Sequence, residues 1–437
     1  MKPFLCKFFV WVTATWMLSG CMLYDLHDDL ERQDRYGSVS GTVRSDTSHH
    51  KPIQVLLVKV NMLDDHDNTI ANSTVMFKPG PFQFFALPGT YMVGAFEDRN
   101  EDMIFQPDEY VGWHGAPDPI IVKPNKKHEG LSVILRSSEQ AHLQFPLLYE
   151  LPPFQMSREL VGKFRVGEVV KLSDPRFAAK NGDMGFWEPL EFMEDVGGGV
   201  FFLQKYDPEK IPILIVHGAG GNPVEFKHII KGLNRDKFQP WVLFYPSGMR
   251  LGIISKWVST TLSILLVQHK FEHLYILAHS MGGLVARDVI NRMIREGGGK
   301  VLQLFVSLST PWDGHVFAAK GVKQCPVVIP AWYDMVPGSP FIKSLSKTPL
   351  PSHLEYNLFF SYRGGWHLTM PPSNDGTVSL RSELFLPVEL SAKKVLGFDV
   401  THGGILSSPA VIERLNMLFE ERSKKNRLGL NRCGHNV

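Results

Sequence analysis

Residues 274–283 read LYILAHSMGG, and this stretch decides the fold. Its first four residues are apolar, as in a buried parallel strand, and small residues follow where the chain would turn. Helical periodicity then places Val285, Val289 and Met293 on one face, until three glycines at 297–299 stop the pattern. The order of strand, tight turn and helix therefore puts Ser280 at the turn.

Three other apolar runs end in loops in the same way. They are residues 211–216, followed by HGAGG, residues 241–245, followed by PSG, and residues 302–308, followed by STP. Repeated strand and helix units of this kind indicate a parallel sheet that is covered on both faces. We therefore predict a doubly wound, mostly parallel α/β domain over residues 201–425, with a C-terminal tail at 426–437.

Residues 38–138 follow a different pattern, with short runs of period-two alternation separated by turn residues at 79–81 and 88–89. This pattern predicts a small antiparallel β-sandwich ahead of the α/β domain. Residues 85–98 resemble transthyretin-like or carboxypeptidase-regulatory-like modules, and we expect an accessory module whose ligand would be a protein or a glycan. We interpret residues 139–200 as a linker followed by an N-terminal extension of the next domain.

An acidic stretch in the sandwich invites comparison with a calcium-binding loop. Asp98, Asn100, Asp102 and Glu109 fall at positions 1, 3, 5 and 12 of an EF-hand-style loop. Met103, however, stands where such a loop needs glycine for its sharp turn. An acidic hairpin tip on a solvated surface explains the same residues, so we predict no metal site.

The N-terminus predicts the compartment. Lys2 and Lys7 precede and flank an apolar run that is too short for a comfortable membrane span, which is the layout of a secretory signal peptide over residues 1–20. The run ends in LSGC at residues 18–21, which resembles a bacterial lipobox. We expect cleavage before Cys21, lipidation of its thiol and a tether over residues 21–37. The alternatives are an uncleaved anchor and a signal that is cut elsewhere.

These features imply a lipid-anchored protein of the bacterial cell envelope, at the outer membrane if the host is Gram-negative.

The chain of 437 residues is 44% apolar and 21% charged, which makes disordered, collagen-like and polytopic membrane classes poor fits. Removal of Lys2 and Lys7 with the signal leaves 46 − 2 = 44 basic residues against 44 acidic ones, so no nucleic-acid partner is implied. The four cysteines are too scattered for a disulfide framework, and at most Cys325 and Cys433 could pair.

Ser280 is the candidate nucleophile. A serine hydroxyl is a weak nucleophile until a base removes its proton, and a sharp elbow exposes the hydroxyl above the strand. Ala278 and Gly282 provide the small neighbours that such a turn needs, in the pattern Ala-x-Ser-x-Gly. The competing interpretation is a structural helix cap, but the position at the strand-to-helix switch favours the nucleophile.

Two backbone N–H groups are candidates for an oxyanion hole, which stabilises the negative charge that develops in acyl transfer. Met281 would provide one, and the loop after residue 216 the other, from Ala219 or from its rival Gly220. A phosphate-binding loop is the alternative, but Gly218, Gly220 and Gly221 match neither the GxGxxG pattern nor a P-loop that ends in Gly-Lys-Ser/Thr. We expect His217 and His279 to be structural.

The acid and base should follow the nucleophile in chain order. Asp375 lies in the turn sequence NDGTV, and His402 lies in THGG after the apolar run 395–398. We therefore predict a triad of Ser280, His402 and Asp375. The rival acid is Asp313, and the rival bases are His315 and His367.

Residues from about 203 to 421 resemble an α/β-hydrolase of the lipase/esterase group. The similar segments are 215–218, 278–283, 309–311, 335–341 and 375–378, some of which are seen in GPI-inositol-deacylase-like and triacylglycerol-lipase-like relatives. Ala278 departs from the first elbow glycine, as is common in bacterial lipases. The resemblance implies a serine hydrolase that needs neither metal nor cofactor and acts through an acyl-enzyme.

The leading hypothesis is therefore an envelope-anchored hydrolase of carboxylic esters, with a lipid or other acyl ester as substrate. One alternative is an acyltransferase that uses the same triad, and another is a non-catalytic binding lipoprotein with a hydrolase fold. The insertion between 312 and 375 holds two apolar stretches, at 327–332 and 358–360, that would form either a lid or acyl pocket or plain core.

Overall fold

The structure is a computed structural model, which describes residues 26–28, 30–32, 34–45, 51–60, 69–106, 108–114, 118–137, 164–364 and 373–433, with side chains up to residue 426. The predicted signal peptide, the lipidation site Cys21 and the rival base His367 lie outside these ranges. Cys325 carries a free thiol.

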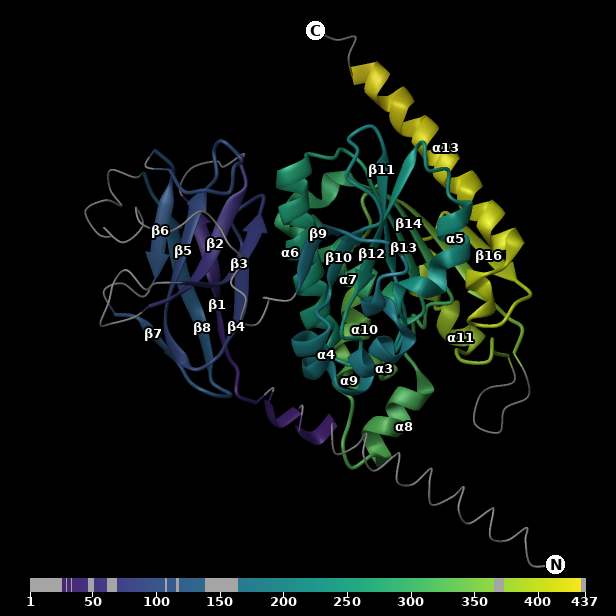
Figure 1. Cartoon of the computed structure of the whole chain (residues 1–437), viewed down its shortest axis with the longest axis horizontal. Coiled ribbons are helices and arrows are strands. Elements are labelled where there is room, and N and C mark those ends of the chain that lie inside the picture. Colours follow the sequence, from purple (N-terminus) through teal and green to yellow (C-terminus); the bar gives the residue numbers. More distant parts are fainter. Residues whose placement is uncertain are drawn as a thin grey trace, which may run out of the picture.

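An eight-stranded sheet forms the larger part of the molecule (Figure 1). In chain order its strands are β9 (Arg165–Val169), β10 (Gly199–Phe202), β11 (Ile211–Val216), β12 (Phe238–Phe244), β13 (Leu274–His279), β14 (Leu302–Leu308), β15 (Glu355–Ser361) and β16 (Lys394–Phe398). Their order across the sheet is β16-β15-β14-β13-β11-β12-β10-β9, and within it only β10 and β12 pair antiparallel. The predicted mostly parallel α/β sheet is confirmed.

The sheet begins earlier than the predicted boundary at residue 201. Residues 164–200, interpreted as linker and extension, contribute the edge strands β9 and β10, together with η3 (Pro175–Phe177), α3 (Ala179–Trp187) and α4 (Pro189–Asp195). The physical reason is that the edge strand β9 is partly exposed and the buried strand β10 is only four residues long, so neither shows the long apolar run that identifies a central parallel strand.

Helices cover both faces of the sheet (Figure 1). On one face α6 (Leu251–His269) packs against α7 (Met281–Glu296), and on the other α5 (Lys227–Gly232) packs against α13 (Pro409–Cys433). The shorter elements are η4 (Pro223–Phe226), η5 (Gly298–Val301), α8 (Val316–Gln324), α9 (Pro330–Met335), α10 (Pro340–Leu345), α11 (Leu380–Glu383), α12 (Leu386–Glu389) and η6 (Gly404–Leu406). By length and composition α6 could cross a membrane, but 67% of its apolar window is buried inside the protein.

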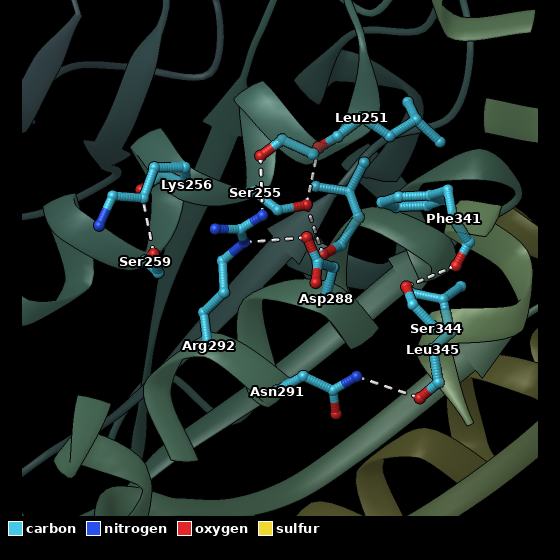
Figure 2. A network of polar contacts seen from close by, with 12 residues as sticks. Leu251, Ser255, Lys256, Ser259, Asp288, Asn291, Arg292, Phe341, Ser344 and Leu345 are labelled. Atoms are coloured by element: carbon cyan, nitrogen blue, oxygen red, sulfur yellow. Dashed lines mark hydrogen bonds and ion pairs between the residues drawn. The ribbon is translucent and has the colours of Figure 1, made fainter. Parts of the chain in front are cut away.

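A polar network fixes α7 between α6 and α10 (Figure 2). Arg292 pairs with Asp288 one turn earlier at 2.9 Å and donates to the carbonyl oxygen of Gly252 on α6 at 3.1 Å. On the other side, Asn291 donates to the carbonyl oxygen of Leu345 at 3.0 Å. These bonds hold α7, the helix that begins directly after Ser280, against α6 and α10.

Two smaller sheets form the N-terminal part. One has the order β4-β1-β8, and the other has the order β3-β2-β5-β6 with β7 paired to β5. The strands are β1 (Gly37–Ser45), β2 (Ile53–Lys59), β3 (Thr69–Met76), β4 (Pro81–Ala86), β5 (Gly89–Glu97), β6 (Val111–His114), β7 (Ile120–Val122) and β8 (Lys127–Leu135). Apolar side chains from both sheets share one buried cluster, which includes Val39, Val55, Val93 and Val133.

The purely antiparallel arrangement predicted for residues 38–138 needs correction, because β1 and β8 pair in parallel. Hairpin neighbours must run antiparallel, and the prediction extended that rule to the whole region. β1 and β8 are instead far apart in sequence, and the chain between them builds β4 and the whole of the other sheet, so both can run in the same direction.

The N-terminal part packs against α6 and the end of α7. The hydroxyls of Thr74 on β3 and Thr260 on α6 lie 3.0 Å apart, and the Phe77 N–H donates to the carbonyl oxygen of Glu296 at 2.8 Å. A small apolar cluster spans the same contact, formed by Val75 and Met103 from the N-terminal part and by Ile264 and Val267 from α6.

In the insertion, residues 358–360 belong to β15, a strand inside the eight-stranded sheet, and Leu358 and Phe359 are buried there. This stretch is therefore core rather than lid.

Candidate active site

Ser280 occupies a strained turn between β13 and α7. Its backbone has φ 54° and ψ −132°, and a positive φ is uncommon for a residue other than glycine. The turn is crowded: a Cβ on Gly218 would lie 2.9 Å from the Ser280 Cβ, and one on Gly282 would collide with the His217 carbonyl oxygen. The small residues around Ser280 are therefore a steric requirement of the turn.

Asp375 is a fully buried carboxylate on the loop after β15. Its Oδ1 accepts hydrogen bonds from the backbone N–H groups of Thr377 at 2.9 Å and Val378 at 2.7 Å, and its Oδ2 accepts from the Ser361 hydroxyl at 2.7 Å. Gly376 has φ 99°, which permits this tight turn. The carboxylate is thus oriented before any base approaches it.

His402 meets this carboxylate from the loop after β16. Its Nδ1 lies 2.6 Å from Asp375 Oδ2, and its backbone N–H donates to the Asp375 carbonyl oxygen at 2.9 Å. Burial alone would raise the pKa of Asp375, but the hydrogen bond and charge of His402, with the Val378 and Ser361 donors, hold it at about 2. An ionised acceptor keeps the proton on Nδ1, so Nε2 is left as the basic nitrogen.

His279 links Ser280 to the His402 loop. It directly precedes Ser280, and its Nε2 lies 3.0 Å from the His402 carbonyl oxygen. Burial, together with the nearby His402, lowers the pKa of His279 to about 3, so it is a neutral donor there. Among the described hydrogen bonds none joins the Ser280 hydroxyl to His402, and such bonds often tighten only when substrate binds.

The loop after β11 distinguishes the two oxyanion candidates. The Gly220 N–H donates to the Ser247 hydroxyl at 2.9 Å, so this donor is already engaged. Ala219 is exposed at the same loop, and Met281 opens α7 directly after Ser280. The arrangement therefore favours Ala219 over Gly220 as the partner of Met281.

His217 supports that loop from below. Its Nδ1 lies 2.8 Å from the Gly218 carbonyl oxygen, and the Tyr245 hydroxyl donates to the His217 carbonyl oxygen at 2.7 Å. Burial lowers the pKa of His217 to about 4, so the ring is neutral.

The rival acid and base have other partners. The carboxylate of Asp313 lies 4.0 Å from the Arg381 guanidinium. The Nε2 of His315 lies 2.8 Å from the Thr377 carbonyl oxygen, while its Nδ1 accepts the N–H of Phe317 at 3.3 Å and so caps α8. Both ring nitrogens of His315 are therefore engaged.

Several supporting residues were not predicted from the sequence. The Ser361 hydroxyl donates to Asp375, and the Glu383 carboxyl group accepts the Ser361 N–H. The Ser247 hydroxyl accepts the Gly220 N–H in the loop after β11. Each lies at or beyond the end of a strand or helix, far in sequence from the residue that it supports. No local motif identifies such residues, because the fold alone brings them to the site.

No cluster of three or more His, Cys, Asp or Glu side chains within the described ranges is arranged to hold a metal ion. In the acidic loop of the N-terminal part, Asp98 accepts the backbone N–H groups of Asp102 and Met103, and Glu109 accepts those of Arg99 and Gln106. These carboxylates thus serve as caps of their own loop.

Comparison with known proteins finds similarity over about half of the chain. A lipase of Bacillus licheniformis, BlEst2 in mature form, is 16% identical with a TM-score of 0.38, over 47% of this chain and 89% of that chain. The product of the gene lin2722 of Listeria innocua is 18% identical with a TM-score of 0.37, over 47% and 92%. Lipase B of Aspergillus fumigatus is 14% identical with a TM-score of 0.37, over 52% and 55%.

No curated protein matches the chain. Residues 253–343, which include Ser280, match the family model described as "Putative serine esterase (DUF676)".

Proposed function

We propose that this protein is a serine hydrolase of carboxylic esters, with Ser280 as nucleophile, His402 as general base and Asp375 as the orienting acid. The observation that carries the proposal is the distance of 2.6 Å between His402 Nδ1 and Asp375 Oδ2. This pair lies at the carboxyl ends of the parallel strands, where Ser280 occupies a strained turn after β13. The family match over residues 253–343 supports the same chemistry at Ser280.

The first half of the reaction forms an acyl-enzyme. The Ser280 oxygen attacks the ester carbonyl carbon while His402 Nε2 accepts the hydroxyl proton. The backbone N–H groups of Ala219 and Met281 stabilise the oxyanion. As the tetrahedral intermediate collapses, the bond to the alkoxy group breaks and His402 returns the proton to the departing alcohol.

The second half releases the acid. Water attacks the acyl-enzyme with His402 again taking the proton, and the Ser280 oxygen leaves as a hydroxyl. Throughout, Asp375 remains ionised, because four hydrogen-bond donors surround it, and so it stabilises the imidazolium that forms twice in each cycle.

We further propose that lipidation of Cys21 anchors the enzyme at the cell envelope. Leu26 is fully buried in the core cluster of the α/β part, and Arg32 pairs with Glu194 of α4 at 3.5 Å. The chain that follows the lipobox is therefore attached to the α/β part. An enzyme tethered in this way meets bilayer lipids first, which favours a lipid ester as substrate.

The activity is tested by labelling the folded protein with a fluorophosphonate and reading its intact mass. We expect one adduct that Ser280→Ala abolishes, whereas Ser346→Ala, at an exposed position after α10, labels as the wild type does. Labelling that persists in Ser280→Ala, or unchanged turnover of p-nitrophenyl esters by that variant, would refute the proposal.

The anchor is tested separately by mass spectrometry of the mature N-terminus and by cell fractionation. We expect an acylated Cys21 and release of Cys21→Ala from the membrane fraction. An unmodified Cys21, or a mature start at another residue, would contradict the anchor without affecting the hydrolase.

A further inference from the structure

A second carboxyl group lies beside the proposed triad. Glu383 is the last residue of α11 and is only 1% exposed. Its Oε2 accepts the Ser361 N–H at 3.1 Å, and the Ser361 hydroxyl donates to Asp375 Oδ2 at 2.7 Å. The Glu383 side chain also faces Asp375 and the hydroxyl of Ser309, which itself lies 2.5 Å from the Ser361 hydroxyl.

The two carboxyl groups differ sharply in their donors. Asp375 accepts from two backbone N–H groups, a serine hydroxyl and His402. Glu383 accepts from the Ser361 N–H and lies against the Ser309 hydroxyl, while its buried Oε1 makes no hydrogen bond with any described residue. No lysine or arginine in the described part of the chain forms an ion pair with either carboxyl group.

Two facing carboxylates in a buried site cannot both remain ionised, because each charge disfavours the other and neither is solvated. The donors around Asp375 keep the charge there. Burial and the neighbouring charge of Asp375 raise the pKa of Glu383 to about 10. Glu383 Oε1 is buried without a hydrogen-bond partner, and the Glu383 side chain lies against Asp375, so Oε1 is the oxygen that can carry the proton.

We propose that Glu383 is a positioning residue that stays protonated and donates its O–H to Asp375. This inference rests on the proposed function for its kinetic consequence. The protonated carboxyl group accepts the Ser361 N–H through one oxygen and donates through the other. It therefore adds a donor to the carboxylate that orients His402 without adding a second negative charge beside the imidazole.

Among the charged groups around Glu383, Asp375 is the one whose negative charge keeps the proton on Glu383. Beyond that carboxylate lie His402, which contacts it, and His315. Burial lowers the pKa of the His315 imidazole. Arg381, on the same helix, has a side chain 90% exposed and cannot compensate a buried charge on Glu383. Ionisation of Glu383 would thus place two negative charges together and stabilise the imidazolium form of His402.

The kinetic test compares two replacements of similar size. Glu383→Gln offers one donor and one acceptor as a protonated carboxyl group does, so kcat/KM at neutral pH should change by less than about threefold. Glu383→Leu offers neither, so kcat should fall by about tenfold or more with KM unchanged. Glu389→Gln, on the neighbouring helix α12, controls for the loss of an acidic side chain in this region.

The outcomes separate the alternatives. A loss above about tenfold in a folded Glu383→Gln would mean that an ionised carboxylate is needed, and full activity in Glu383→Leu would mean that Glu383 does not act on the triad. Either result overturns the inference. If the wild type hydrolyses no ester at all, the proposed function fails first.

A spectroscopic test does not depend on activity or on the leucine variant folding. In infrared spectra at about pH 8.5, the carbonyl stretch of a protonated carboxylic acid should be present in the wild type and in Glu389→Gln and absent from Glu383→Gln. At this pH Glu109, whose pKa burial raises to about 7, is mostly ionised and does not interfere. A wild-type spectrum without this band overturns the proposal.

Discussion

Two buried aspartates in this molecule each cap the backbone of their own loop, yet only one of the two faces a base. Asp98 in the N-terminal part caps the backbone N–H groups of residues 102 and 103, and Asp375 caps those of residues 377 and 378. Behind Asp98 lies the amide of Gln54 at 3.3 Å, whereas behind Asp375 lies the imidazole of His402 at 2.6 Å.

The difference is visible in the electrostatics. Burial, only partly offset by hydrogen bonds, raises the pKa of Asp98, and its charge helps to raise that of Glu109 to about 7. The imidazole and the surrounding donors hold the pKa of Asp375 at about 2. An aspartate that caps its own loop can thus be purely structural. Its chemistry depends on the side chain that the fold places against the carboxylate.

The largest expected effect on activity is at Ser280, the proposed nucleophile that acts with the Asp375–His402 pair. Ser280→Ala removes the nucleophile and should lower kcat for ester hydrolysis by about 10⁴-fold or more while the fold persists. Steady-state kinetics with circular dichroism as the folding control measures this. Retention of more than a tenth of the wild-type rate would contradict the assignment of Ser280 as nucleophile, and with it the catalytic role of the Asp375 loop.

The comparison is sharpest with matched replacements of the two aspartates. Asp375→Asn should lower kcat by about 10³- to 10⁴-fold, because the amide no longer fixes the proton on His402 Nδ1. Asp98→Asn removes a carboxylate from an equally buried turn and should leave activity per folded molecule within about twofold, at a cost in stability of about 1–2 kcal/mol. Equal loss of activity in the two variants would contradict the assignment.

A smaller effect is expected at Ser247. Ser247→Ala frees the Gly220 N–H and loosens the loop that carries the Ala219 donor, so kcat should fall about tenfold with little change in KM. An increase in KM alone would indicate that this loop binds substrate rather than the transition state.

The smallest effect concerns pH and the N-terminal turn. Because folding raises the pKa of Glu109 to about 7, the folded state loses stability relative to the unfolded chain as pH rises from about 4.5 to about 7. Glu109→Gln should therefore melt further below the wild type at pH 5 than at pH 8, where the gap narrows or reverses. A constant difference between the two melting temperatures would show that Glu109 titrates normally.

Burial explains which parts of the fold were predictable. The bounds of β11 and β14 coincide with the largely apolar runs 211–216 and 302–308, because a parallel strand that is covered on both faces is largely apolar. The edge strand β9 is partly exposed and β10 is only four residues long, so neither shows that signature. The parallel pairing of β1 with β8 has no sequence signature either, because a local pattern does not specify which strand a given strand pairs with.

The candidate site divides in the same way. Turn chemistry and chain order select Asp375 and His402 from the sequence, and their side chains lie in contact. Ser361 and Glu383 have no such signal, because a serine at a strand end and a glutamate on a short helix are common everywhere. They are recognised by their contacts with Asp375 and with each other.

The position of α6 has a practical consequence for dissecting this chain. Ile264 and Val267 are almost fully covered, and their cover includes Val75 and Met103 from the N-terminal sheets. If the α/β part were expressed alone, Ile264 and Val267 would become exposed to solvent. They would form an apolar surface on a helix that is already apolar enough to cross a membrane. A protein shortened to the α/β part should therefore aggregate, and polar replacements along the uncovered face of α6 would be needed to keep it in solution.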